Sequence, residues 1–346
     1  MGEWSRIKKV FKSLGLVTLL LVLIFMGWYF AELTYAVRQL YGQVSIISKS
    51  VDVEECLKDV QFKDEYKRKL HYISDVKKFA QDSLGLTTTD SYSTFFDQNG
   101  EDILWNVTAS EKYQLESYQW EFPIAGSFSY KGFFDYGRAQ LEFKARLEDG
   151  LDVSLSPVGA WSTLGVFKDP ILSNMLERSE GDLAELIIHE MTHATVYIKD
   201  DVGFNENLAT FIGEKGVEIF LRGYNKSNPL WLEAYLRRKS QKREWINFVI
   251  EYAEKLDHIY IDVQDQEVEV KEKVKSNFMS VFVLEGNKKR AELDLPVYSI
   301  RDTLINNTYF LSYLRYHGGQ DGLDSLYEFR FNGDFRSMLS YYQNQE

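Results

Sequence analysis

His189-Glu190-Met191-Thr192-His193 is the segment from which the rest of the chain can be interpreted. Because residues four apart lie on one face of a helix, His189 and His193 can present both imidazoles to a single metal ion. Glu190 projects beside them, where its carboxylate can accept a proton from a water molecule. The spacing is therefore typical of a zinc hydrolase site.

The residues around this motif favour a buried helix over an exposed one. Apolar side chains precede it at Leu186-Ile187-Ile188 and follow it at Ala194-Thr195-Val196-Tyr197, so most of the helix surface is apolar. Upstream, Ser179-Glu180-Gly181-Asp182 has the spacing of a capping box, which predicts that the helix begins there. We therefore expect the motif in the interior of a rigid helix, about two to three turns from its start.

A second helix is expected shortly after the first. Asp200-Asp201-Val202-Gly203 is typical of a short turn, and Asn205 is a suitable N-cap for a helix from Glu206 to Leu221. Two helices joined by so short a connection can pack antiparallel to each other.

This hairpin is expected to supply a further ligand, because a catalytic zinc takes three protein ligands and keeps one position open. An ideal hairpin brings residues near Thr210 opposite His193, which leaves Glu206 and Glu214 each about one turn away in opposite directions. Glu206 is the first choice, since modest fraying of the first helix favours it, and Glu214 is the alternative. Helix geometry alone leaves that choice open.

The pair of motifs is also the basis of a family resemblance. An HExxH helix followed by an Asn-Glu-x-x-Ala helix resembles the gluzincin metallopeptidases, in which the Glu of the second motif is the third zinc ligand, and that Glu matches Glu206. More narrowly, the chain is similar to the bacterial putative aminopeptidase family of membrane-associated proteins with an HExxH motif. The resemblance covers roughly residues 30 to 221 well and the remainder loosely. The matching segments beyond the zinc motif are Phe122-Pro123-Ile124-Ala125-Gly126, Tyr130-Lys131-Gly132-Phe133-Phe134-Asp135, Trp161-Ser162-Thr163-Leu164-Gly165-Val166-Phe167-Lys168-Asp169-Pro170 and Phe204-Asn205-Glu206.

The N-terminus predicts a membrane anchor. Leu14 to Phe30 is an apolar run of 17 residues without a charge, preceded by basic residues and ended by Glu32. As a helix it would span about 26 Å, close to the thickness of a bilayer core. A cleaved signal peptide is the alternative, but the bulky Trp28-Tyr29-Phe30 stands where small residues precede a cleavage site. We expect a single-pass anchor in the bacterial inner (cytoplasmic) membrane, with everything after Glu32 in the periplasm or outside the cell.

The cysteine content argues against a lipoprotein-type anchor and an internal disulfide, and the net charge argues against a nucleic-acid partner. Members of the resembled family often carry a lipoprotein-type cysteine after the leader, whereas the only cysteine here, Cys56, lies too far past the apolar run and cannot form an internal disulfide. The formal net charge of -12 argues against nucleic acid as a partner, since a phosphate backbone requires a basic patch. A hydrophobic content of 45% over 346 residues is ample for a sizeable core.

Residues 91–165 differ in character from the helical residues before them. Short aromatic-rich runs such as Ile103-Leu104-Trp105-Asn106-Val107 and Leu151-Asp152-Val153-Ser154-Leu155 predict a small antiparallel sheet. Zincin-type sites set a strand beside the HExxH helix to pair with the substrate main chain, and the second run is well placed in sequence for that role. Tyr130 and Tyr136 are candidates for donating a hydrogen bond to the oxyanion that forms when water attacks a carbonyl.

The C-terminal residues predict further helices. These are Pro229 to Leu256, Asp262 to Lys275 and Pro296 to Leu314. His258 and His317 could approach the zinc site from this region, and the Tyr316-His317 position is the preferred one.

Together these patterns predict an α+β fold that is mainly helical, in which a zincin-like metallopeptidase domain with a small antiparallel sheet follows one transmembrane helix. The expected divisions are residues 1–32 as a basic tail and anchor, 33–90 as helices, 91–165 as the sheet-containing part, 179–221 as the zinc-site helices and 222–346 as a C-terminal helical region.

The function that these observations favour is a membrane-anchored zinc peptidase with one Zn²⁺ per chain, Glu190 as its general base and a peptide as its substrate. Aminopeptidase specificity is implied by the resemblance. The alternative is a membrane-tethered binding or scaffold protein with a non-catalytic metal site. A structural zinc normally has four protein ligands, often Cys, whereas this pattern offers three and no Cys, which favours catalysis. Hydrolysis of another amide, such as one in the cell wall, is a third possibility.

Overall fold

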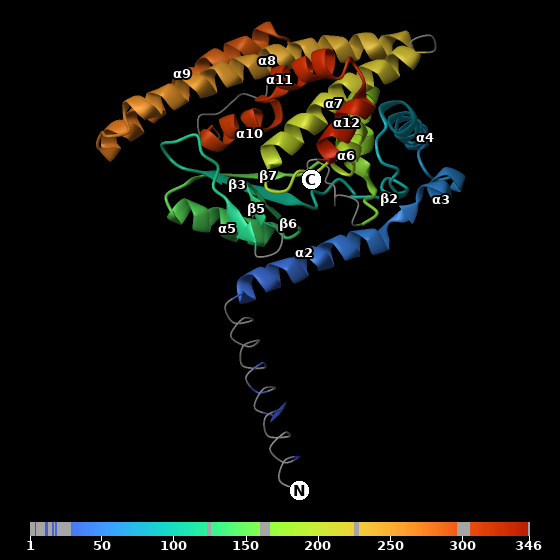
Figure 1. The fold of residues 1–346 in the computed structure, drawn as a ribbon, viewed down its shortest axis with the longest axis horizontal. Helices are drawn as coiled ribbons and strands as arrows, with labels where there is room; N and C mark the ends of the chain where they lie inside the picture. Colours follow the sequence, from blue (N-terminus) through green and yellow to red (C-terminus); the bar gives the residue numbers. More distant parts are fainter. Residues whose placement is uncertain are drawn as a thin grey trace. The chain divides into compact units, whose positions relative to one another are not determined.

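Figure 1 shows the fold of the chain in a computed structural model. The structure describes residues 29–122, 126–159, 167–224, 228–295 and 305–344, together with Trp4, Phe11, Lys12, Leu16 and Thr18. The chain divides into two compact units, Met1–Ser48 and Lys49–Glu346. Most of the described residues are helical and the strands form small sheets, so the predicted α+β, mainly helical class is confirmed.

The first unit is represented chiefly by the helix α2 (Phe30–Lys49). Among the described residues, no helix combines the length and the apolar character needed to cross a bilayer. Most of the expected anchor, Leu14 to Phe30, lies outside those residues. The anchor therefore stays a prediction.

The core of the second unit is built on three helices. α4 (Asp64–Phe79) packs on α6 (Glu180–His193), and α6 forms a helical hairpin with α7 (Val202–Tyr224). Apolar residues recur along these helices at the spacing of one face, as do Leu183 and Ile187 of α6, and both of these are fully buried. The HExxH helix is therefore part of the hydrophobic core, as the sequence predicts.

A three-stranded sheet lies beside this core. β3 (Trp105–Ser110) is its central strand and pairs antiparallel with both β6 (Lys131–Phe133) and β7 (Asp152–Pro157). This confirms the small antiparallel sheet expected in residues 91–165. β7 pairs with β3 along one side, which leaves β7 as an edge strand among the residues that the structure describes.

One helix within residues 91–165 was not predicted from the sequence. This helix, α5 (Tyr136–Glu148), lies between β6 and β7 in the chain and contacts β3 and β7. The helix α10 (Asn307–His317) contacts the same two strands. The sheet lies between α5 and α10 in Figure 1. Two smaller sheets are formed by β1 (Val51–Asp52), β2 (Thr94–Phe96) and β8 (Ile171–Leu172), and by β4 (Trp120–Phe122) and β5 (Gly126–Phe128). The β2–β8 pair is parallel, and β8 comes from a segment far downstream of β2.

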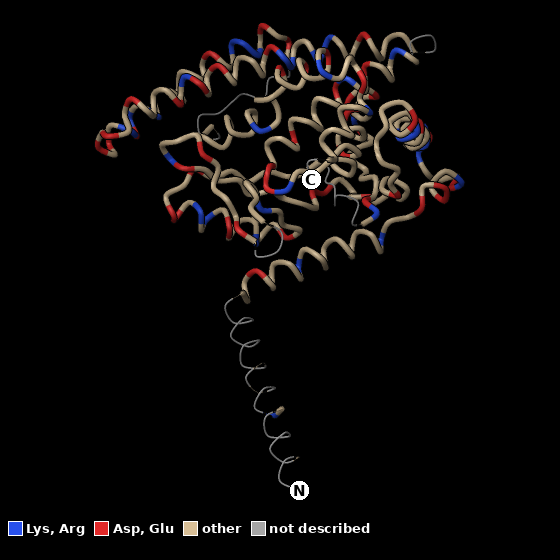
Figure 2. The backbone as a smooth tube through the Cα atoms, viewed as in Figure 1, with Lys and Arg blue, Asp and Glu red and all other residues tan. Residues whose placement is uncertain are grey.

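Two long helices follow α6 and α7. α8 (Pro229–Asp262) and α9 (Val268–Glu292) pack against each other, and Figure 2 shows acidic and basic residues interspersed along both. The expected helix from Asp262 to Lys275 is therefore wrong in its bounds, since α8 ends where it should begin and the residues before Val268 form the turn between two helices. The first residues of the expected helix from Pro296 lie outside the described residues, and its later part is α10.

Shorter elements complete the second unit. They are α3 (Val53–Lys58), the π-helical turn η1 (Ala80–Leu84), the 3-10 turn η2 (Ser173–Glu177), α11 (Gln320–Ser325), the π-helical turn η4 (Leu326–Arg330) and α12 (Phe335–Gln343).

A buried polar network holds the first residue of β7 against the C-terminal helices. Lys275 of α9 and Asp152 of β7 are both more than nine-tenths buried, and the Lys275 Nζ lies 2.5 Å from the Asp152 Oδ2. The backbone N–H of Asn307, at the start of α10, donates to the same carboxylate at 2.9 Å. The Asn307 side chain donates to the backbone oxygens of Glu111 at 2.8 Å and Gln114 at 3.0 Å. Since these groups replace water around a buried charge, they fix the position of β7 relative to α9 and α10.

Candidate metal and catalytic site

The HExxH helix begins where the sequence predicts. Ser179 is the N-cap of α6, and its Oγ accepts a hydrogen bond from the backbone N–H of Asp182 at 3.3 Å. The helix ends at His193, however, with Ala194 as its C-cap. The motif therefore occupies the last turn of α6 and not its interior, because the chain turns toward α7 directly after the second histidine.

The loop between the two helices is fixed by Asn205, although not as an N-cap. α7 begins at Val202, so Asn205 lies inside the helix, and the predicted start at Glu206 is wrong by one turn. The Asn205 side chain accepts from the backbone N–H of Ile198 at 2.8 Å and donates to the Ile198 oxygen at 2.7 Å. Asp201 accepts from the backbone N–H of Phe204 at 2.9 Å, which is the hydrogen bond expected of a capping residue.

Three side chains converge at this hairpin. The Nε2 atoms of His189 and His193 lie 3.1 Å apart, and the Glu206 Oε2 lies 3.3 Å from the first and 3.5 Å from the second. Tetrahedral zinc with bonds of about 2.0–2.1 Å has ligand atoms about 3.3 Å apart. The three donor atoms therefore have the chemistry and the spacing of a site for one metal ion, and all three side chains are at least three-quarters buried.

Glu214 takes no part in this group. Its carboxylate forms an ion pair with the Lys239 Nζ of α8 at 3.1 Å, and the same ammonium lies 2.8 Å from Glu218. On α7, Glu214 thus faces α8 while Glu206 faces α6. Of the two alternatives that the sequence left open, Glu206 is the residue that lies with the histidines.

The charges of the group follow from burial and from neighbouring residues. Burial by itself would raise the pKa of Glu206, but hydrogen bonds from His189 and His193 hold it well below its usual range, so the carboxylate is charged. Burial raises the pKa of Glu190, the histidines oppose this effect, and the carboxylates of Glu206 and Asp169 add to it. A carboxylate whose pKa is raised is a stronger base, which suits proton transfer near neutral pH.

Two tyrosines lie close to the group. Burial raises the pKa of Tyr130, which stands between β5 and β6, and the negative charge of Glu206 raises it further. The same two causes raise the pKa of Tyr316, whose ring centre lies 6.4 Å from that of His189. Both phenols therefore remain protonated and can donate a hydrogen bond. Tyr136, by contrast, is half exposed and packs on Trp105 at 5.4 Å, and the structure does not bring it to the group.

The sequence placed the C-terminal contribution at Tyr316-His317 and named His317. In the structure Tyr316 lines the cavity that contains His189, whereas the charges acting on His317 come chiefly from Lys242 and Glu185. Burial, followed by the Lys242 charge, lowers the pKa of His317 to about 4, so this imidazole is neutral at pH 7. Its role in catalysis stays a prediction. Two histidines outside the site, His258 and His71, are exposed.

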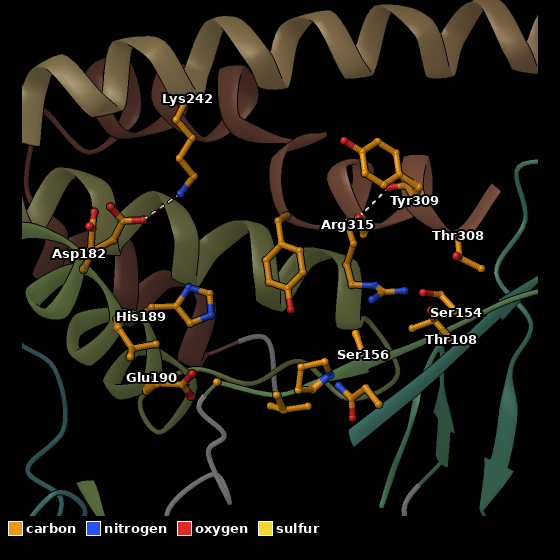
Figure 3. A pocket seen from close by; sticks show the side chains of 18 of the residues that line it. Thr108, Ser154, Ser156, Asp182, His189, Glu190, Lys242, Thr308, Tyr309 and Arg315 are labelled. Carbon is orange, nitrogen blue, oxygen red and sulfur yellow. Dashed lines mark hydrogen bonds and ion pairs between the residues drawn. The ribbon is translucent and has the colours of Figure 1, made fainter. Parts of the chain in front are cut away.

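A cavity of about 690 Å³ opens beside the group (Figure 3). Its walls are the edge strand β7 with Ser154 and Ser156, the HExxH helix with His189 and Glu190, and α10. The run Leu151 to Leu155, which was expected beside the HExxH helix, thus contributes to β7 and lines the same cavity as that helix. The unpaired edge of β7 can accept another extended chain.

Metal binding should follow this geometry. We expect about one zinc per chain in the full-length protein and little or none in Glu206→Ala, because two histidines alone leave the ion without its third protein ligand. Elemental analysis of the purified proteins measures this, and Glu214→Ala is the matched control that should keep its zinc. Equal zinc in Glu206→Ala and the parent would contradict the assignment of the third ligand.

The chain can be compared with known proteins and protein families. No curated protein and no solved structure shows significant similarity to the chain. The model of the family described as "Putative aminopeptidase" matches residues 34–345, which is nearly the whole chain. The chain therefore belongs to the putative aminopeptidase family.

Proposed function

We propose that this member of the aminopeptidase family is a zinc-dependent peptidase of the gluzincin type that hydrolyses peptides from their amino ends. The observation that carries the proposal is the spacing of 3.1 to 3.5 Å among the donor atoms of His189, His193 and Glu206, with Glu190 beside them in an open cavity. Aminopeptidase specificity rests on the family.

The zinc would be held by His189, His193 and Glu206, and it would supply Lewis-acid chemistry that polarises a carbonyl group and lowers the pKa of a water molecule. Glu190 accepts the proton that the attacking water loses and then delivers it to the nitrogen of the leaving amine. The edge of β7 holds the substrate main chain by hydrogen bonds of the kind that join neighbouring strands. Tyr130 and Tyr316 can each donate a hydrogen bond to the oxyanion.

A catalytic role is favoured over a scaffold with a structural metal. Among the described residues the group holds three possible protein ligands, whereas a structural zinc is usually closed by four. The only cysteine, Cys56, is buried in the hydrophobic core with Phe95 and Ile171 and is not one of the donors. Three protein ligands would leave a position on the ion for a reacting group, and the cavity lined by His189 and Glu190 would give that group access.

Glu190→Gln tests the general base. The amide keeps the size of the side chain but cannot accept a proton, so we expect peptide hydrolysis to fall about a thousandfold while zinc content stays at the parent level. Hydrolysis is measured on short peptides, and Glu233→Gln, at an exposed position on α8, is the control that should keep full activity. Parent-like turnover in Glu190→Gln would exclude Glu190 as the base.

Tyr130→Phe and Tyr316→Phe distinguish the two oxyanion donors. Removing one such donor typically lowers kcat about a hundredfold and changes KM little, because the hydrogen bond forms mainly in the transition state. Steady-state kinetics of both variants measure this, with Tyr136→Phe as the control outside the site. If both variants keep the kcat of the parent, the oxyanion is stabilised by another group.

We further propose that Leu14 to Phe30 anchors the protein in the bacterial inner membrane, with residues after Glu32 on its outer side. The support is the length of this uncharged apolar run and the basic residues before it. The full-length chain should sediment with membranes and resist extraction by high salt, whereas a version without residues 1–32 should not. Recovery of the intact chain in the soluble fraction would contradict the anchor.

A further inference from the structure

Arg315 is a cation in the cavity, and no acidic residue in the described part of the chain pairs with it. It belongs to the last turn of α10 and extends into the space between that helix and β7 (Figure 3). Its guanidinium carbon lies 5.9 Å from the ring centre of Tyr130. Among the described residues no aspartate or glutamate forms an ion pair with it.

The other basic residues that line the cavity differ from Arg315. The Lys242 Nζ lies 3.4 Å from the Glu185 carboxylate, so its charge is compensated within the protein. Arg178 is exposed, and water can hydrate it. Arg315 is partly buried, which makes its charge more costly to leave without a counter-ion than that of an exposed arginine.

The wall facing Arg315 offers neutral hydrogen-bonding groups. Its residues are Asn106 and Thr108 of β3 and Ser154 and Ser156 of β7. In Figure 3, Ser154, Ser156 and Thr108 lie near the guanidinium, while His189, Glu190 and Asp182 lie on the other side of the cavity.

The cavity therefore has acidic side chains at one end and the Arg315 cation at the other. The carboxylates that line it, Asp182, Glu185 and Glu190, all come from α6, and none comes from α10 or the sheet. An arginine with hydroxyl groups around it matches a carboxylate, because the guanidinium can donate two parallel hydrogen bonds and the hydroxyls can donate to the remaining lone pairs. An ammonium group or an apolar side chain of a ligand would gain no such hydrogen bonds at the Arg315 end of the cavity.

We propose that Arg315 binds a carboxylate of the peptide substrate, and that the enzyme thereby selects peptides that carry one within reach of the metal site. The proposal rests on the peptidase function proposed above. The carboxylate can be the C-terminus of a short peptide or the side chain of an aspartate or glutamate. The strand β7, to whose edge a peptide can pair, presents Ser154 and Ser156 to the same cavity that Arg315 lines.

Binding is measured by titration calorimetry in the Glu190→Gln background, so that the peptides are not consumed. The full-length protein in detergent is titrated with trialanine and with trialanine amide, which differ only in the terminal carboxylate. We expect the acid to bind about tenfold or more tightly than the amide when Arg315 is present, and both to bind equally in Arg315→Gln. Arg315→Lys should restore part of the preference, since it keeps the charge and loses the two parallel hydrogen bonds.

A second pair of peptides identifies the source of the carboxylate. Ala-Ala-Glu amide is compared with Ala-Ala-Gln amide, and a preference for the first that is lost in Arg315→Gln assigns the site to an acidic side chain. The control is Arg222→Gln, at an exposed position on α7 outside the cavity, which should keep both preferences. Thermal unfolding of each variant confirms that it is folded.

The inference is overturned if Arg315→Gln leaves the preference for the carboxylate unchanged, or if neither pair of peptides shows a preference in the Arg315 protein. These results are independent of the reaction. Failure of the parent protein to hydrolyse peptides would refute the proposed function and leave the binding result valid, whereas hydrolysis that ignores the carboxylate would refute the role of Arg315 alone.

Discussion

Close packing of α6 on α7 is the constraint on which the candidate metal site depends. Gly213 permits it, because a Cβ at that position would lie 3.1 Å from the backbone oxygen of Glu185 and 3.6 Å from the Cβ of His189. A larger residue would push the helices apart by a few tenths of an ångström. Metal–ligand distances tolerate only about 0.2 Å, so the hydrophobic core sets the accuracy with which Glu206 meets the two histidines. The geometry of the candidate metal site thus depends on how tightly the core is packed.

What the sequence could predict follows from what a single helix determines. The spacing of His189 and His193 requires only the helical repeat, and the capping role of Ser179 requires only neighbouring residues, so both could be read without knowing the fold. The choice between Glu206 and Glu214 depends on the rotation of α7 and on Lys239, which comes from another helix.

Other features of the site and the fold also depend on contacts between separate elements, which local sequence does not determine. Adjacent helical residues point about 100° apart, so Tyr316 could be distinguished from His317 only once the rotation of α10 was known. Asn205 suits a helix N-cap by its residue type, yet its hydrogen bonds to Ile198 bridge back across the loop. The parallel pairing of β2 with β8 joins segments more than seventy residues apart, and no local pattern marks it. Arg315 belongs to no sequence motif. It is distinguished only by the lack of an acidic partner among the described residues, and that requires the fold.

The anchoring of Asp152 also imposes an order on the maturation of the protein. The candidate metal ligands lie between positions 189 and 206, whereas the groups that compensate Asp152 are at positions 275 and 307. Because the ribosome makes the chain from its N-terminus, Asp152 must remain hydrated until more than one hundred further residues have emerged. A nascent chain would therefore contain the candidate metal ligands well before β7 is fixed in its final position.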